Sequence, residues 1–328
     1  MNVIEIGVGA ESHVEPMPCL MLTGASGFIG AAFLKLALAQ GWRVRVLTRK
    51  PSEWTAQDGL DVFEGDLAYT PDWTQALQGV QVVVHAAAEI KDADLMSVVN
   101  VQGPMRLLDA AIQSGVKRWV QLSSVGAYGP VQDGVVTEDC PDRPAGPYEV
   151  SKTDLDVALM QATQRSGIEV CIVRPSNVYG PNMRNQSIHQ LMNTIRKGLF
   201  AYIGPPGASA NYVHVDDVVQ ALALCMVNPK AANQTYIVSA WASMEDMVNA
   251  LAKGAGLRPP TRRMNLRVVT WLAVALHKWP RWPLTLSRVH AMSLRSRYST
   301  QKIEDELGWK LTVPVQDGMS QLAKVTTT

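Results

Sequence analysis

Short, almost wholly apolar runs alternate with longer amphipathic segments over the first half of the chain. Apolar runs bounded by turn residues predict buried strands, and we expect these strands at residues 19–22, 42–47, 60–63, 80–86, 117–122 and 168–173. Amphipathic segments, such as the one that carries Phe33, Leu34 and Leu38, lie between the runs and predict helices. Continuous apolar strands alternating with helices are typical of a parallel sheet covered on both faces. The pattern therefore predicts an α/β fold with a doubly wound sheet.

This alternation loosens after residue 181. Helical patterns near residues 186–197, 215–227, 243–255 and 315–325 are separated by short strands such as residues 235–238. We therefore expect three parts: a polar leader at residues 1–18, a sheet domain at 19–181 and a smaller domain at 182–328. Segments around 210–240 are expected to return to the sheet domain.

The first strand ends in a glycine-rich turn that opens a helix, Thr23-Gly24-Ala25-Ser26-Gly27-Phe28-Ile29-Gly30. Glycines at this spacing let the backbone turn sharply, approach a pyrophosphate and pack the helix against the sheet. The free N–H groups at the start of a helix also favour negative charge. The turn predicts a Rossmann-type domain that binds a dinucleotide through six residues: Gly24, Ser26, Gly27, Phe28, Ile29 and Gly30.

The second strand ends in a basic stretch, Thr48-Arg49-Lys50. An acidic residue at this position binds the ribose 2′-hydroxyl of NAD, whereas an arginine suits the additional phosphate of NADP. We therefore expect Arg49 to favour NADP over NAD, with a hydrated basic turn as the alternative. At the end of the fourth strand, the small residues Ala86 and Ala87 allow a flat cofactor to lie close.

Composition excludes several classes of protein. With 328 residues and a 47% hydrophobic fraction the chain can bury a large core, and its net charge of +1 indicates no nucleic-acid partner. The four cysteines are scattered without CxxC spacing, so neither a disulfide framework nor a metal site is expected. No secretory signal pattern begins the chain, which makes the cytoplasm the expected location.

Charge is distributed unevenly, because residues 248–302 contain eleven Lys or Arg and no Asp or Glu. Such a block predicts an anionic neighbour: a phosphorylated substrate, an acidic lipid surface or acidic parts of the same chain. Its apolar run at residues 268–276 is too short to span a bilayer, which needs about 20 residues. With Trp271, Trp279 and Trp282, region 264–286 could contact a membrane surface peripherally. A core helix with a hydrated basic end is the simpler interpretation.

Tyr148 and Lys152 lie four residues apart at the start of a predicted helix, which places both side chains on one face. A nearby cation stabilises a phenolate and lowers the pKa of a tyrosine, so the pair could exchange a proton with a substrate oxygen. Ser124 follows the fifth strand, at the edge where open α/β sheets bind ligands. It could hold the substrate oxygen while charge develops on it.

Together these motifs resemble the extended short-chain dehydrogenase/reductase family, also called the NAD(P)-dependent epimerase/dehydratase family. Its landmarks are matched from about residue 19 to 325 by Thr23 to Gly30, Gly65-Asp66-Leu67, Asn100, Ser123-Ser124 with Tyr128-Gly129, Tyr148 to Lys152, Arg174 to Pro181, Val213 to Val218 and Glu306 to Trp309. The resemblance implies hydride transfer between a nicotinamide and a substrate carbon. Tyr148 would move the proton, Lys152 would bind the nicotinamide ribose and tune Tyr148, and Ser124 would polarise the carbonyl.

The same resemblance implies further cofactor contacts from Asp66, Leu67, Pro175, Asn177 and Val178. It also implies a homodimer formed through the helices that contain Asn100 and Lys152.

Missing residues narrow the activity within this family. Dehydratases and decarboxylases of this family usually carry an acid just before the Tyr-Gly that follows the strand-five serine, and the GDP-sugar epimerase/reductases use a cysteine there. Residues 125–127 contain neither, which disfavours these activities. Residues 204–212 lack the cation that sugar-nucleotide enzymes use for the diphosphate, so the chain looks more like the 3β-hydroxysteroid dehydrogenase and ketone reductase branch. Four arginines could supply that contact from elsewhere: Arg184, Arg196, Arg295 and Arg297.

The first hypothesis is an NADP-preferring dehydrogenase or reductase of a fairly apolar, sterol-like or acyl-like substrate. The second is a nucleotide-sugar 4-epimerase with tightly bound NAD. A non-catalytic NAD(P)-binding regulator is disfavoured, because Ser124, Tyr148 and Lys152 are all present.

Overall fold

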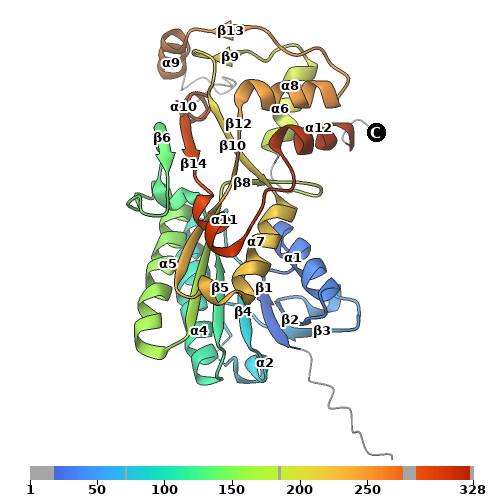
Figure 1. Cartoon of the computed structure of the whole chain (residues 1–328), viewed down its shortest axis with the longest axis vertical. Coiled ribbons are helices and arrows are strands. Elements are labelled where there is room, and N and C mark those ends of the chain that lie inside the picture. The colour runs from blue at the N-terminus through green and yellow to red at the C-terminus, as the bar shows by residue number, and fades with distance from the viewer. Residues whose placement is uncertain (1–17, 71, 184–185, 276–285, 326–328) are drawn as a thin grey trace, which may run out of the picture.

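A seven-stranded sheet forms the centre of the computed structural model, which describes residues 18–70, 72–183, 186–275 and 286–325 (Figure 1). All its strands pair in parallel, in the order β11-β7-β5-β4-β1-β2-β3. Their bounds are β1 Cys19–Thr23, β2 Arg43–Thr48, β3 Leu60–Glu64, β4 Val82–His85, β5 Arg118–Leu122, β7 Glu169–Pro175 and β11 Gln234–Val238. The predicted doubly wound α/β fold is confirmed. Strand order reverses between β1 and β4, the place where such sheets bind ligands.

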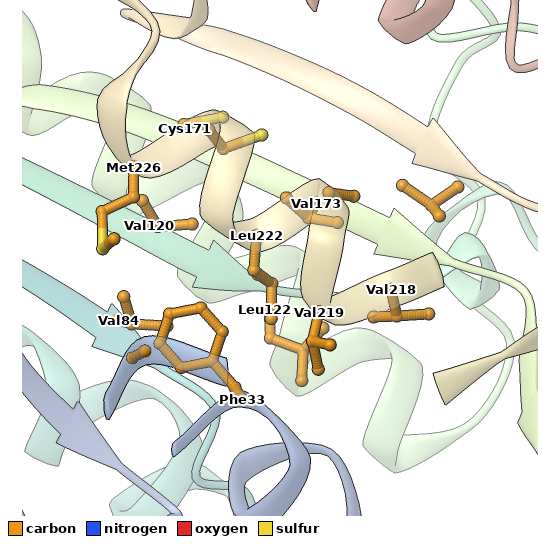
Figure 2. Packing of buried hydrophobic residues seen from close by; sticks show 14 of the residues in the cluster. Phe33, Val84, Val120, Leu122, Cys171, Val173, Val218, Val219, Leu222 and Met226 are labelled. Atoms are coloured by element: carbon orange, nitrogen blue, oxygen red, sulfur yellow. The ribbon is translucent and has the colours of Figure 1, made fainter. Parts of the chain in front are cut away.

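Helices cover both faces of this sheet, as the apolar runs require. On one face lie α1 (Phe28–Ala39) and α7 (Val215–Val227), and on the other lie α2 (Thr74–Leu77), α4 (Gly103–Gln113) and α5 (Pro147–Ser166). Figure 2 shows Phe33 of α1 and Leu222 of α7 packed against Val84 and Val120 of the sheet. Both faces of each central strand are therefore dry, which explains why these strands are almost entirely apolar.

The helix that contains Asn100 is present but is not regular. It consists of α3 (Ala93–Ser97), a π-helical turn η2 (Val98–Gln102) and α4. Single π turns inside helices occur often at functional sites. This one carries Asn100, whose side chain is buried.

The C-terminal part contains smaller sheets above the seven-stranded one (Figure 1). β8 (Asn177–Tyr179), β10 (Ser209–His214) and β12 (Ala240–Ser243) form a three-stranded sheet. Two strand pairs join β9 (Tyr202–Ile203) to β13 (Arg263–Met264) and β6 (Asp133–Val136) to β14 (Arg295–Tyr298). Because β11 and α7 belong to the central sheet region, part of segment 210–240 does return there, while the domain boundaries stay a prediction.

The remaining helices surround these sheets. They are α6 (Ser187–Arg196), α8 (Met244–Gly254), α9 (Leu266–Ala275), α10 (Leu286–Ala291), α11 (Gln301–Leu307) and α12 (Val315–Val325). The expected leader, apart from its last residue, and residues 276–285 of the basic segment lie outside the described residues. None of the helices in the described ranges is long and apolar enough to cross a membrane.

Candidate active site

A cavity of about 320 Å³ lies at the switch point between β1 and β4. Its wall is built from the glycine turn, the end of β2, the turn after β3 and the end of β4. Eight of the predicted cofactor-binding residues line it: Gly24, Ser26, Gly27, Arg49, Asp66, Leu67, Ala86 and Ala87. Segments distant in sequence thus meet at one cavity, and cofactor contact from these residues stays a prediction.

The glycine turn is shaped to bring backbone close to a ligand. Gly24 has φ of +73°, and a Cβ there would lie only 2.6 Å from the amide nitrogen of Ala87. The amide of Gly27 donates to the carbonyl of Gly24 over 2.9 Å, which closes the turn, and α1 begins at the next residue without a side-chain cap. Uncapped N–H groups at the edge of the cavity suit a pyrophosphate, so these residues fit a dinucleotide.

Three other predicted residues of this motif pack the helix. Phe28 and Ile29 are partly buried against the core, and Gly30 is buried where a Cβ would overlap the carbonyl of Gly24. Direct cofactor contact from these three residues stays a prediction.

Arg49 extends into solvent at the edge of the cavity. Its side chain is 77% exposed, and its Nη1 lies 4.0 Å from the Oδ2 atom of Asp66. The neighbouring Lys50 instead pairs with Glu53 over 2.7 Å. Both cations line the cavity, and they differ in their partners, because Lys50 is paired closely with Glu53 and Arg49 has only the long contact with Asp66.

Ser124 and the first turn of α5 are neighbours. Ser124 caps the 3₁₀ turn η3 (Val125–Tyr128), and its Oγ accepts from the amide of Gly126 over 3.0 Å. A Cβ on Gly126 would lie 3.2 Å from that oxygen and 2.6 Å from Cγ of Glu149, the residue after Tyr148. The structure therefore brings the strand-end serine beside the turn that carries Tyr148. Their catalytic roles stay a prediction.

Lys152 is buried one turn further along α5. Burial lowers the pKa of its ammonium group to about 8, against an opposing effect of Asp156. The buried imidazole of His85, at the end of β4, has its pKa lowered by burial and by the charge of Lys152. Nδ1 of His85 lies 2.8 Å from the Thr23 hydroxyl. Nε2 of the same ring is buried and has no hydrogen-bond partner among the described residues.

Asp156 is a site residue that the sequence analysis missed. Its carboxylate is buried and accepts from the Ser123 hydroxyl over 2.6 Å and from Nε and Nη2 of Arg174, each over 3.1 Å. Arg174 also binds both oxygens of Asp142, over 2.7 and 2.9 Å. The available signal was the spacing, because Asp156 follows Lys152 by the same four residues that separate Lys152 from Tyr148.

The pKa of Tyr148 differs from the expectation. Burial, with smaller effects of Glu149 and Asp156, raises the pKa of this phenol to about 12. The predicted lowering by Lys152 is therefore wrong for the ligand-free protein, because burial dominates and both nearby carboxylates act in the same direction as burial. Tyr148 is protonated at neutral pH.

Asn100 joins the loop after β4 to α5. Its Oδ1 accepts from the amide of Glu89 over 2.6 Å, and its Nδ2 donates to the Glu89 carbonyl and the Ser151 hydroxyl, each over 2.9 Å. Ser151 in turn donates to the carbonyl of Tyr148 over 2.8 Å. The π turn thus ties the first turns of α5 to the loop after β4, which lines the cavity.

The predicted contacts after β7 are placed differently from one another. Pro175 is buried at the end of β7, Val178 is partly buried in the core, and Asn177 is exposed and donates to the carbonyl of Asn211 over 3.2 Å. Cofactor contact from these residues stays a prediction.

The side chain of Glu149 places an acid next to residues 125–127, where the sequence showed none. Residues 125–127 hold no acid, but the side chain of Glu149 lies directly against Gly126. An ionisable group from another element therefore occupies that neighbourhood, so a missing acid in residues 125–127 alone does not disfavour elimination chemistry.

Comparison with known proteins agrees with this geometry. Residues 20–239 match the model of the NAD dependent epimerase/dehydratase family. The chain is 30% identical to a UDP-glucose 4-epimerase of Vibrio cholerae, covering 93% of this chain and 94% of the other. It is 26% identical to 3beta-hydroxysteroid-dehydrogenase/decarboxylase isoform 1 of Arabidopsis thaliana, covering 92% and 78%. The structure of UDP-glucuronic acid 4-epimerase from Bacillus cereus shares the fold, with a TM-score of 0.74 at 19% identity over 94% of this chain and 100% of that one.

Proposed function

Because this chain belongs to the NAD dependent epimerase/dehydratase family and is an enzyme, we propose that it transfers hydride to or from a hydroxy/keto carbon of a fairly apolar, sterol-like or acyl-like substrate. The observation that carries the proposal is the placement of Ser124 beside the turn of α5 that carries Tyr148, with Lys152 buried one turn further along.

Each of the three side chains has a distinct task. A bound nicotinamide dinucleotide supplies or accepts the hydride. With a pKa near 12, Tyr148 holds its proton at neutral pH and can donate it to the oxygen of a ketone. The buried ammonium of Lys152 then stabilises the phenolate, and the Ser124 hydroxyl donates a hydrogen bond to the substrate oxygen as charge develops there.

An apolar substrate is supported by the loop that precedes and forms β10. Residues 204–212 contain no cation, and the nearby Arg295 donates to the carbonyls of Pro205 and Pro206, over 3.2 and 2.8 Å. Because the Arg295 guanidinium is engaged by these loop carbonyls, it is less able to bind a diphosphate. Several relatives have names that refer to sterols.

A nucleotide-sugar 4-epimerase is the second candidate, because the 30% identical relative is a UDP-glucose 4-epimerase matched over almost its whole length. The two candidates differ in their use of cofactor. An epimerase is expected to retain NAD through purification and to need none added, whereas a reductase consumes NADPH in proportion to product.

We also propose NADP as the preferred cofactor, a homodimer and a cytoplasmic location. Support for NADP comes from the exposed Arg49 beside the cavity. Support for a dimer comes from Val150 and Val157, two turns apart on α5 and 40% and 47% exposed.

The test is a screen of sterol ketones, acyl ketones and UDP-sugars against the protein and its Tyr148→Phe variant. We expect NADPH-dependent reduction of an apolar ketone, and a loss of about 10²- to 10⁴-fold in kcat in the variant. Cofactor binding measured by fluorescence should persist in the variant. Turnover of a UDP-sugar without added cofactor, or full activity of Tyr148→Phe, would overturn the proposal.

A further inference from the structure

Helix α9 has two apolar sides, of which one is buried and the other is largely exposed. Val269 and Ala273 are buried against Ile203 and Val289. The opposite side, here called the α9 face, exposes three large apolar side chains: Val268 at 53%, Trp271 at 68% and Val274 at 52%. Surface helices usually turn their apolar side to the core, so exposed apolar residues on the second side of α9 are unusual.

The position of the α9 face suits an external contact. α9 lies with β13 at the end of the molecule remote from the central sheet and its cavity (Figure 1). Single exposed hydrophobic residues are ordinary on protein surfaces. Three of them within two turns of one helix, one being a tryptophan, form a continuous patch of the kind that marks interaction sites.

The basic block of residues 248–302, which contains α9, has several exposed cations, and one of them, Arg267, lies on α9 itself. Among the described residues, one cation of the basic block pairs with a carboxylate, Arg263 with Glu245 over 2.6 Å. Three others are engaged by neutral groups: Arg295 by loop carbonyls, Arg297 by the ring of Trp241 and Lys302 by Gln234. Arg267 on α9 itself is exposed, as are Lys253, Arg258 and Arg262. The acidic parts of the chain therefore account for only one of these charges.

We propose that the α9 face docks the protein on an anionic lipid surface, with Trp271 among the headgroups and Arg262 and Arg267 against lipid phosphates. An apolar helix face flanked by cations is typical of helices that lie in a membrane interface, and anionic lipids attract basic segments. A second copy of the chain fits less well, because a symmetric contact would place cations against cations. This inference goes beyond the proposed reaction and does not rest on it.

Flotation of the full-length protein with vesicles tests the proposal. We expect binding to vesicles of phosphatidylglycerol and phosphatidylcholine in equal parts, little binding to phosphatidylcholine alone, and release at high salt. Arg262→Gln and Arg267→Gln should each weaken binding about fivefold, and Trp271→Ser about tenfold.

Matched controls lie on the central sheet region. Lys35→Gln removes an exposed cation of α1, and Val227→Ser removes a 58% exposed apolar residue at the end of α7. Both should bind vesicles like the unaltered protein, and all variants should keep its melting temperature and its activity in solution. Equal binding to both kinds of vesicle, no binding, or equal losses in the controls overturn the proposal. So does a Trp271→Ser variant that changes oligomer size while vesicle binding persists, since the α9 face would then join copies of the chain.

Discussion

Lys152 and Asp156 lie one helical turn apart on α5, and both side chains are buried. Arg174 contacts the two carboxylates of Asp142 and Asp156, so these three groups together carry one excess negative charge. The ammonium of Lys152 cancels it. The cluster is therefore neutral only while Lys152 keeps its proton.

Asp156→Asn is expected to lower the pKa of Lys152, because it removes the carboxylate that opposes the effect of burial. Lys152 is charged below its pKa and neutral above it, so activity that needs the ammonium falls as the pH rises through that value. In the unaltered enzyme the fall in kcat/KM should begin near pH 8. In the variant it should begin about one unit lower or more.

The pH dependence of kcat/KM with the best ketone substrate measures this shift. Ser123→Ala is the control, since it removes one hydrogen bond to the same carboxylate and leaves the charge. A merely structural role of Asp156 would lower activity equally at all pH values. An unshifted profile in a folded Asp156→Asn protein would contradict the assignment.

The sequence predicts best those parts of the site whose interacting residues are close together along the chain. The glycine turn, the strand-end serine and the Tyr148–Lys152 spacing are local features, which the structure has at the end of β1, after β5 and at the start of α5. Their roles in the reaction stay predictions. The π turn at Asn100 was not predicted, because the hydrophobic pattern there is that of an ordinary helix. The side-chain partners of Asn100 lie 11 and 51 residues away, in Glu89 and Ser151.

The electrostatics of the site were less predictable for the same reason. Asp156 meets Arg174 because α5 packs against β7 in the folded protein. The sign of the Tyr148 pKa shift depends on burial, which a spacing of four residues does not specify.

Arg49→Ala is expected to weaken NADPH binding about ten- to a hundredfold, the usual effect of losing a hydrogen bond to a charged group. NADH binding should change little, because the exposed guanidinium has only a 4.0 Å contact with Asp66 in the ligand-free protein. Titration of both reduced cofactors by fluorescence gives the two affinities. Lys50→Ala, which removes a cation already paired with Glu53, should affect both equally. Equal losses in Arg49→Ala would remove the case for NADP.

Comparing Gly24→Ala with Gly41→Ala separates the effect of backbone strain from the effect of the close approach beside the cavity. Gly24 and Gly41 both have positive φ, +73° and +82°, but nothing lies within 4 Å of a Cβ on Gly41. Gly41→Ala should therefore cost only about 1–2 kcal/mol of unfolding free energy. Gly24→Ala should cost more and should also abolish cofactor binding, because its methyl group meets the Ala87 amide. Urea unfolding and cofactor titration compare the two variants, and similar behaviour would show that the close approach at Gly24 is unimportant.

The side chain of Glu149 occupies the space that a side chain at Gly126 would need. A Cβ there would lie 2.6 Å from Cγ of Glu149 and 3.2 Å from Oγ of Ser124. Gly126→Ala should therefore displace both side chains and lower kcat about tenfold or more, since an error of about 1 Å in a reacting group is enough for such losses. Cofactor affinity should be unchanged, because Gly126 lies after β5, away from the glycine turn.

The double variant Gly126→Ala/Glu149→Ala tests the cause, because removing the Glu149 side chain frees the space for the new methyl group. It should recover much of the activity lost in Gly126→Ala when compared with Glu149→Ala alone, which is a coupling that two independent sites do not show. Kinetics of the four proteins with one ketone substrate complete the cycle. If the two losses simply add, the contact between Gly126 and Glu149 does not set the geometry of Ser124. Loss of all activity in Glu149→Ala alone would instead give this carboxylate a direct part in the reaction.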